Sequence, residues 1–320
     1  MIRRILTYFI IVIPAVLSVL NIVPFTKIHW AFELNREFSF HYLILNLIAV
    51  LLTPFLLKGK EIGVKLGVVT ILLLLISFTG SVLRPFYFEP VTLKTPTTHA
   101  IPFSILYGSI QSSETEDDWL HSLVYDKNPT FIGLRGVNLL EREQAIAKQL
   151  YPYSVTDLGY DSSYGKAGIG IYSRLPIVEL TEGDPGKGVV MASVKDPSFK
   201  DLVLVLIDTP SGWNEDDIYD RKVLLKRLAS YFRQREDNVI LFGNFATTPF
   251  TWDYKQFQSE GVFLDAAYGH GYLSTTSELG PLGYFPLDYF LYAGDLSVRE
   301  FTLPKRANNR SALFGKFAIW

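Results

Sequence analysis

The segment Val239–Trp252, with the sequence VILFGNFATTPFTW, has the layout of a catalytic loop. Its apolar run, Val239–Phe242, predicts a strand that leads into a turn beginning with glycine and continuing through two threonines and a proline. Enzymes with α/β folds place reactive side chains where a sheet strand ends. The two positions best placed to act carry Asn244 and Ala246. The segment is therefore either an active site or only the shell of one.

The composition excludes several kinds of functional site. The chain has 320 residues and no cysteine, which excludes disulfides and thiolate metal sites. The net charge of −2 gives no overall basic field to attract nucleic acid, so we expect no nucleic-acid partner. No two histidines have the spacing of metal ligands on one helix or turn. The histidines are His29, His41, His99, His121 and His270.

The apolar residues are concentrated in the first 85 positions. The mean hydropathy of the chain is +0.20, and three long apolar segments predict three transmembrane helices at Ile5–Phe25, Phe38–Leu57 and Leu66–Leu83. Arg3 and Arg4 before the first segment would also fit a cleaved signal peptide. That alternative is disfavoured because the apolar run is too long and no small-x-small cleavage site follows it.

The basic residues predict the orientation of these helices. Lysine and arginine are more numerous at the N-terminus and in the turn between the second and third helices than in the loops on the opposite side of the membrane. This excess marks the N-terminus and that turn as cytoplasmic. Three crossings would then place the rest of the chain outside the cytoplasm, as a periplasmic or extracellular domain of a multi-pass protein in the cytoplasmic (inner) membrane. The residues on the predicted cytoplasmic side are Arg3, Arg4, Lys58, Lys60 and Lys65, against Lys27, Arg36 and Arg84 on the other.

Side chains within the membrane segments suggest how the helices associate. Asn46 lies inside the second segment, and an amide in hydrocarbon is expected to bond across to another helix. Pro14 and Pro54 are expected to kink their helices. Phe86–Phe88 would form an aromatic belt at the membrane interface. The bundle is either a simple anchor or a surface that docks onto another membrane protein. The absence of acidic residues inside the spans argues against an ion pathway.

The rest of the chain alternates between strand-like and helix-like patterns. Residues 89–100 are rich in Pro and Thr and predict a linker, so the domain boundaries are 1–88, 89–100 and 101–320. About nine strands with a few helices favour a sheet sandwich over one doubly wound sheet. The expected strands are Phe103–Tyr107, Thr130–Leu134, Ala167–Ser173, Gly188–Val194, Leu202–Ile207, Val239–Phe242, Leu287–Tyr292, Leu296–Thr302 and Gly315–Ile319, and the expected helices are Glu116–Tyr125, Leu139–Leu150, Asp216–Arg235 and Trp252–Gln258.

Five segments in series resemble the endonuclease/exonuclease/phosphatase superfamily. The loop at Val239–Trp252 is similar to the superfamily's GDFNA-x-P loop. The other four are GIGIYSRLPI (Gly168–Ile177), LVLIDTPSG (Leu204–Gly212), FLDAAYGHG (Phe263–Gly271) and PLDYFLYAGDLSV (Pro286–Val298). The resemblance covers roughly Ile101–Trp320 and implies an α+β fold, a four-layer αββα sandwich, preceded here by three transmembrane helices.

The resemblance also implies a chemistry, namely Mg²⁺-assisted hydrolysis of phosphate esters by acidic, amide and histidine side chains. Carried over position by position, almost every one of these groups is replaced. Ser109 stands in place of the Asn, Gly136 in place of the metal-binding Glu, Asp208 in place of a His, and Asn244 and Ala246 in place of the Asp and Asn of the loop. Asp288 is retained, Tyr289 stands in place of a His, and the C-terminal SDH motif falls on Asn309, Arg310 and Ser311.

These replacements predict a site that is filled by charges of its own. Asp208 and Asp288 fall at positions that face each other in the superfamily, and two carboxylates there need a cation. Our hypothesis is an ion-pair cluster of Asp208, Arg310 and Asp288, with Arg135 as a second possible source of the positive charge. The sharper alternative is a divalent metal held by Asp208 and Asp288. His270 is the histidine nearest the expected mouth, and a surface loop position is favoured over a role as a base.

The sequence therefore predicts a membrane-anchored pseudoenzyme. With no intact catalytic set and no cofactor, the domain would serve as a binding or structural subunit of a membrane protein complex, with the lipid bilayer and integral-membrane or extracytoplasmic proteins as partners. One alternative is a diverged, Mg²⁺-dependent phosphodiesterase or phosphatase acting outside the cytoplasm. Another is a receptor that binds a phosphorylated ligand through Arg135 or Arg310 without cleaving it.

Overall fold

The computed structural model describes residues 2–22, 29–88, 100–109, 117–136, 150–157, 161, 162, 165, 166, 168–181, 186–210, 212, 214–235, 237–275, 285–304 and 312–320. The chain divides into two compact units. The first comprises Met1–Pro85 together with Thr248–Trp252, and the second comprises Phe86–Thr247 together with Asp253–Trp320. The expected linker, apart from Ala100, and the expected helix Leu139–Leu150, apart from its last residue, lie outside the described residues.

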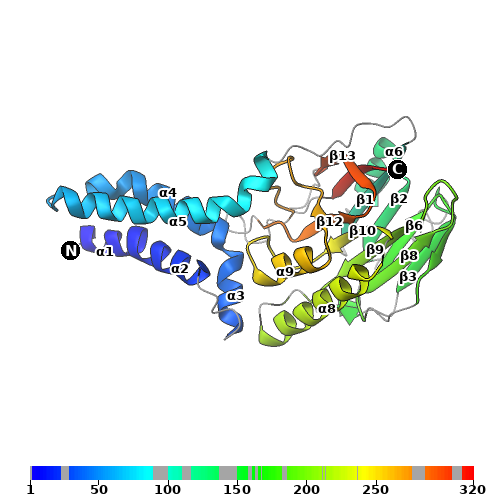
Figure 1. The fold of residues 1–320 in the computed structure, drawn as a ribbon, viewed down its shortest axis with the longest axis horizontal. Coiled ribbons are helices and arrows are strands. Elements are labelled where there is room, and N and C mark those ends of the chain that lie inside the picture. The colour runs from blue at the N-terminus through cyan, green and yellow to red at the C-terminus, as the bar shows by residue number, and fades with distance from the viewer. Residues whose placement is uncertain are drawn as a thin grey trace. The chain divides into compact units, whose positions relative to one another are not determined.

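The first unit is a helical bundle with three candidate membrane spans, as the sequence predicts (Figure 1). A short π-helical stretch interrupts the first span just before Pro14, which has no backbone N–H to continue the ladder. Between the first two spans lies a short helix, α3, that the sequence did not predict. The bounds are α1 Ile2–Thr7, η1 Tyr8–Val12, α2 Ile13–Ile22, α3 Trp30–Glu37, α4 Ser39–Leu56 and α5 Ile62–Phe88.

Apolar and polar contacts hold the spans together. Ile11, Ala49 and Leu72 form a buried cluster, one residue from each span. The Asn46 amide donates a hydrogen bond to the Ser18 hydroxyl on α2 at 2.8 Å, which confirms that Asn46 bonds across to another helix. In hydrocarbon such a bond both stabilises the pair and fixes its register, because water offers no competing partner.

The second unit contains two six-stranded mixed sheets. The first has the order β13-β14-β1-β2-β6-β3 and the second has the order β11-β12-β10-β9-β8-β7. The strands of the first are β1 Ile101–Ser109, β2 Phe131–Arg135, β3 Tyr153–Asp157, β6 Ile169–Ser173, β13 Leu296–Thr302 and β14 Leu313–Ile319. Those of the second are β7 Ile177–Glu179, β8 Val189–Val194, β9 Leu202–Asp208, β10 Asn238–Asn244, β11 Leu264–Asp265 and β12 Asp288–Ala293, and β4 Asp161–Ser162 and β5 Gly165–Lys166 form a separate ribbon.

The sheets pack face to face, with a helical layer on each outer side. A Cβ on Gly133 of β2 would lie 2.1 Å from the Phe242 ring of β10, so only glycine permits this close approach of the sheets. Val124 of α6 (Asp117–Lys127) packs on the outer face of the first sheet. The apolar face of α8 (Glu215–Arg233) and α9 (Trp252–Glu260) cover the second. This arrangement confirms the four-layer αββα sandwich (Figure 1).

The C-terminal end of α5 differs from the expectation. Phe86 is 2% exposed and packs edge-on against the rings of Tyr268 and Tyr272. Its carbonyl accepts a hydrogen bond from the Gly271 N–H at 2.7 Å. Phe86 is therefore a core residue of the second unit, whereas Tyr87 and Phe88 are exposed as an interfacial belt requires.

Candidate functional site

Strand register brings the sequence-predicted positions together. Asn244, the last residue of β10, pairs with Asp208 at the end of β9 on one side and with Asp288 at the start of β12 on the other. In the facing sheet, Ser109 at the end of β1 pairs with Arg135 at the end of β2. Paired residues on neighbouring strands share a face of the sheet, so each sheet contributes one row of side chains to the same end of the sandwich.

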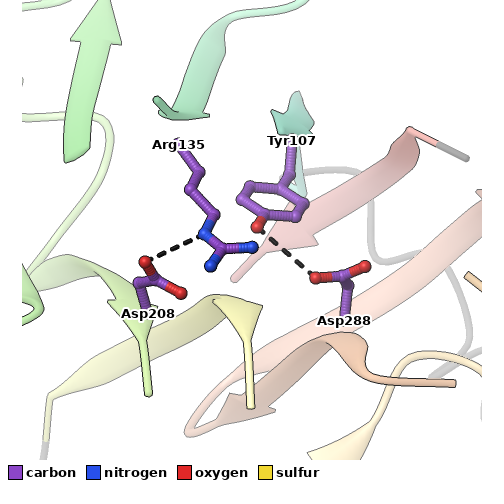
Figure 2. A network of polar contacts seen from close by, with 4 residues as sticks. All are labelled: Tyr107, Arg135, Asp208 and Asp288. Carbon is purple, nitrogen blue, oxygen red and sulfur yellow. Dashed lines mark hydrogen bonds and ion pairs between the residues drawn. The ribbon is translucent and has the colours of Figure 1, made fainter. Parts of the chain in front are cut away.

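An ion pair connects the two rows. The Arg135 Nε donates to Asp208 Oδ2 at 2.9 Å, and the two side chains are 6% and 2% exposed. The Tyr107 hydroxyl, two residues before Ser109 on β1, donates to Asp288 Oδ1 at 3.4 Å. Figure 2 shows the Arg135 guanidinium lying between the two carboxylates, with Tyr107 beside it. We call these four residues, Tyr107, Arg135, Asp208 and Asp288, the internal cation cluster.

The electrostatics of the cluster keep the guanidinium charged. Burial lowers the pKa of Arg135, but Asp208, Tyr107 and Asp288 together raise it, so that the net pKa lies above its ordinary value. A charged Arg135 is the cation that two facing carboxylates require. The hypothesis of an ion-pair cluster therefore has Arg135 as its observed cation, while Arg310 and Ser311 lie outside the described residues.

The loop after β10 keeps an unusual backbone. Gly243 has φ of 126°, and a Cβ there would lie 2.1 Å from the Ile207 carbonyl oxygen of β9. Ala246 has φ of 48°, in the left-handed region where asparagine and glycine are favoured and alanine is strained. The loop thus holds a conformation that suits Asn, the residue that the resemblance implies here, although it carries Ala.

Asn244 and Gly136 do not complete a metal site. The Asn244 Oδ1 is buried and has no hydrogen-bond partner among the residues that the structure describes. Gly136 has φ of 86°, and its N–H donates to the Gly168 carbonyl at 2.9 Å, so it contributes backbone only.

The donor set does not fit Mg²⁺. A divalent cation needs several oxygen ligands, and the described residues contain no group of three acidic or histidine side chains that could hold a metal ion. A guanidinium already lies between the two carboxylates, where it would repel a second cation. We therefore derive no catalytic step through a metal.

Two further candidates lie apart from the internal cation cluster. Tyr289 follows Asp288 on β12 and so points to the opposite face, into the core beneath α9. Its hydroxyl is 2.9 Å from the Thr247 carbonyl oxygen and 2.5 Å from that of Pro286. His270 packs its ring against Phe301, with centroids 6.1 Å apart, and burial lowers its pKa despite the opposing effect of Glu300.

Sequence reasoning missed Tyr107. The alternation of side chains between the two faces of β1 could have indicated it. Tyr107 and Ser109 are two residues apart and share a face, while Leu106 packs on the outer side. Nothing in the sequence indicated that a tyrosine hydroxyl would reach Asp288 across the sandwich, since the two residues are far apart along the chain.

The fold defines a class of protein: an αββα sandwich, here with a row of polar side chains at its strand ends. The sequence of residues 113–308 matches the Endonuclease/Exonuclease/phosphatase family, and the chain belongs to that family. A search of curated protein sequences finds no match.

Solved structures share the fold at low sequence identity. The human Nocturnin catalytic domain with bound sulfate is 15% identical, with 68% of this chain and 95% of that chain covered and a TM-score of 0.51. An endonuclease/exonuclease/phosphatase from Bacteroides vulgatus is 13% identical, with 69% and 100% covered and a TM-score of 0.52. A Neisseria 3′ phosphatase, NExo, bound to a product DNA hairpin is 12% identical, with 67% and 98% covered and a TM-score of 0.51.

Proposed function

We propose that this protein is a catalytically inactive, membrane-anchored member of the family that serves as a binding or structural subunit of a membrane protein complex. The observation that carries the proposal is the buried Arg135–Asp208 ion pair, at 2.9 Å, in the row of positions where the resemblance implies catalytic groups. A guanidinium occupies the space between the carboxylates where hydrolysis would need a metal ion, and Asp208, which stands in place of a His, is held in an ion pair with it.

Further observations support inactivity. Gly136 supplies no ligand, Ala246 supplies no amide, and Tyr289 turns away from the cluster into the core. Removing one member of a catalytic unit already lowers the rate by orders of magnitude. The proposed function accordingly includes no metal cofactor.

Hydrolysis by the full-length protein in detergent tests the proposal. Bis-p-nitrophenyl phosphate and p-nitrophenyl phosphate are offered with 5–10 mM Mg²⁺ or Mn²⁺, values of the order that saturate weak metal sites. We expect no turnover above that of the Asp288→Ala variant. Metal-dependent turnover that disappears in Asp288→Ala would overturn the proposal and establish the diverged phosphoesterase instead.

The subunit role has its own test. The intact protein is purified in mild detergent from its native membrane, and the proteins that accompany it are identified by mass spectrometry. We expect a defined membrane or extracytoplasmic protein at a fixed ratio to this chain. A single species at the mass of the chain alone, under conditions that retain known membrane complexes, would contradict a subunit role.

We place the N-terminus in the cytoplasm and the second unit outside it, in the cytoplasmic (inner) membrane. The absence of cysteine permits single-cysteine labelling with a membrane-impermeant maleimide. Tyr219 is 65% exposed in the second unit, and Lys60 lies exposed in the turn between α4 and α5. Tyr219→Cys should react in intact spheroplasts and Lys60→Cys only after permeabilisation. The reverse pattern would invert the topology.

A further inference from the structure

The short helix α3 makes polar contacts on both of its faces, all within the first unit. Glu33 and Glu37 are four residues apart and therefore lie on one face, while Asn35 lies about 200° around the helix on the other. Both glutamates are buried, at 4% and 7% exposure. Buried carboxylates require strong hydrogen-bond donors, and their donors identify what this face of α3 binds.

The acidic face binds the segment that follows the degenerate catalytic loop. Glu37 Oε2 accepts the Thr248 N–H at 2.8 Å, and Glu33 Oε1 accepts the Trp252 N–H at 2.6 Å. Trp252 is the first residue of α9, whose opening N–H groups have no partner within the helix. Glu33 thus caps α9 from a distant part of the chain, while Glu37 binds the turn that precedes the helix. Negative charge at that end also suits the helix dipole.

The opposite face of α3 is bonded to the membrane spans. The Asn35 amide donates to the Leu17 carbonyl of α2 at 3.2 Å and also to Asn21. The Tyr42 hydroxyl of α4 donates to Asn35 Oδ1 at 2.8 Å. A polar network of this kind sets the position of α3 relative to both helices, because each bond replaces an otherwise unsatisfied group.

We infer that α3 is a coupling helix, which fixes the backbone of Thr248–Trp252 to the positions of α2 and α4. Thr248–Trp252 is covalently continuous with Thr247, whose carbonyl contacts the Tyr289 hydroxyl, and with Asp253. A change in how α2 and α4 pack would therefore move Thr248–Trp252. This device is independent of whether the domain hydrolyses phosphate esters.

The coupling also constrains the membrane topology. Two spans, α4 and α5, separate α3 from the second unit along the chain. An even number of crossings returns the chain to the side on which α3 lies, and the Glu33 and Glu37 bonds require α3 and Thr248–Trp252 to share a side. Lys60 is one span away from α3 along the chain, so in the labelling experiment it is expected to react from the side of the membrane opposite to Tyr219.

Hydrogen exchange of single amides in the full-length protein tests the inference. In the double variant Glu33→Ala, Glu37→Ala, the amides of Thr248 and Trp252 should exchange about tenfold to a hundredfold faster, because each loses a bond to a charged acceptor. Glu61→Ala, an exposed glutamate of the same unit, is the matched control and should leave both rates unchanged. Unchanged rates in the double variant, with native helix content, would overturn the proposed cap.

Two further variants keep the test decisive. Glu33→Gln with Glu37→Gln preserves the acceptors and the packing but removes the charge, so a severalfold acceleration is expected even if the alanine pair fails to fold. Asn35→Leu tests coupling itself, because it breaks the bonds to α2 and α4 without touching the cap. It should also accelerate exchange at Thr248 and Trp252. An Asn35→Leu protein with normal exchange at both amides would refute the coupling.

Discussion

Removing Arg135 should destabilise the second unit strongly, because it breaks a buried ion pair. Arg135→Met keeps much of the side-chain volume but leaves Asp208, which is 2% exposed, without its counter-ion. At an effective dielectric constant of about 20, two charges about 4 Å apart attract by about 4 kcal/mol. Breaking one side of a buried pair typically costs 3–5 kcal/mol, because the remaining charge stays buried. We expect a loss in this range.

The double variant Arg135→Met, Asp208→Leu distinguishes the net stability that the ion pair contributes from the cost of leaving one charge buried without its partner. Replacing both members of a buried ion pair by apolar groups is often neutral, so the double variant should recover most of the stability lost in Arg135→Met. Asp208→Leu alone should cost less than Arg135→Met, because the buried guanidinium keeps Asp288 as a second carboxylate.

The assay is thermal unfolding of the full-length protein in detergent, followed by tryptophan fluorescence. For a domain of this size, 1 kcal/mol corresponds to about 2–4 °C in Tm, so Arg135→Met should melt about 6–20 °C lower. A double-mutant cycle gives the coupling energy. A coupling energy below about 1 kcal/mol, or a double variant as unstable as both losses combined, would refute the assignment of Arg135 as the internal cation.

Three further predictions concern the metal, the loop backbone and a buried acid. Millimolar Mg²⁺ or Mn²⁺ should leave the Tm of the full-length protein unchanged, since a cation that binds the folded state raises the Tm; a rise that Asp288→Ala abolishes would show that the site does hold a metal ion. Ala246→Gly should stabilise the protein by about 0.5–1 kcal/mol because it relieves a left-handed backbone, whereas Ala229→Gly inside α8 should destabilise it by at least about 1 kcal/mol; equal losses in the two variants would show that Ala246 is not strained. Burial raises the pKa of Asp265 to about 6 from 3.8, against the opposing hydrogen bonds from Tyr254 and Ala267. Because the folded state favours the protonated acid, its contribution is fully present below about pH 4 and is lost as pH rises through 6, a change of about 3 kcal/mol. Asp265→Asn should remove this part of the stability–pH profile between pH 4 and 7, and an identical slope in the variant would exclude Asp265 as its source.

The sequence predicted the membrane spans and most central strands, for different reasons. An apolar run long enough to cross a bilayer has no other stable environment, so Phe38–Leu57 and α4 agree closely. Strands such as β9, buried along their whole length, are continuous apolar runs. Tyr153–Asp157 was missed because β3 is an edge strand in which only Val155 is buried.

The helix α3 was missed for a physical reason as well. Its sequence is WAFELNRE, and charged residues such as its glutamates favour a solvated loop. In the structure both glutamates are buried. Their burial depends on donors more than two hundred residues away, at Thr248 and Trp252. Local periodicity contains no information about such partners.

What the sequence determined by itself is which side chains are absent. The side chains of Gly136 and Ala246 cannot bind a metal or orient water in any conformation, so those losses follow from residue identity alone. What only the tertiary structure decided is what stands in their place. Strand register put Asp208, Asn244 and Asp288 in one row, and the facing sheet brought Arg135 and Tyr107 against that row. The charge of the guanidinium follows from the residue type alone. Which carboxylate it meets depends on the pairing of strands that are distant in the chain, and that pairing is a property of the whole fold.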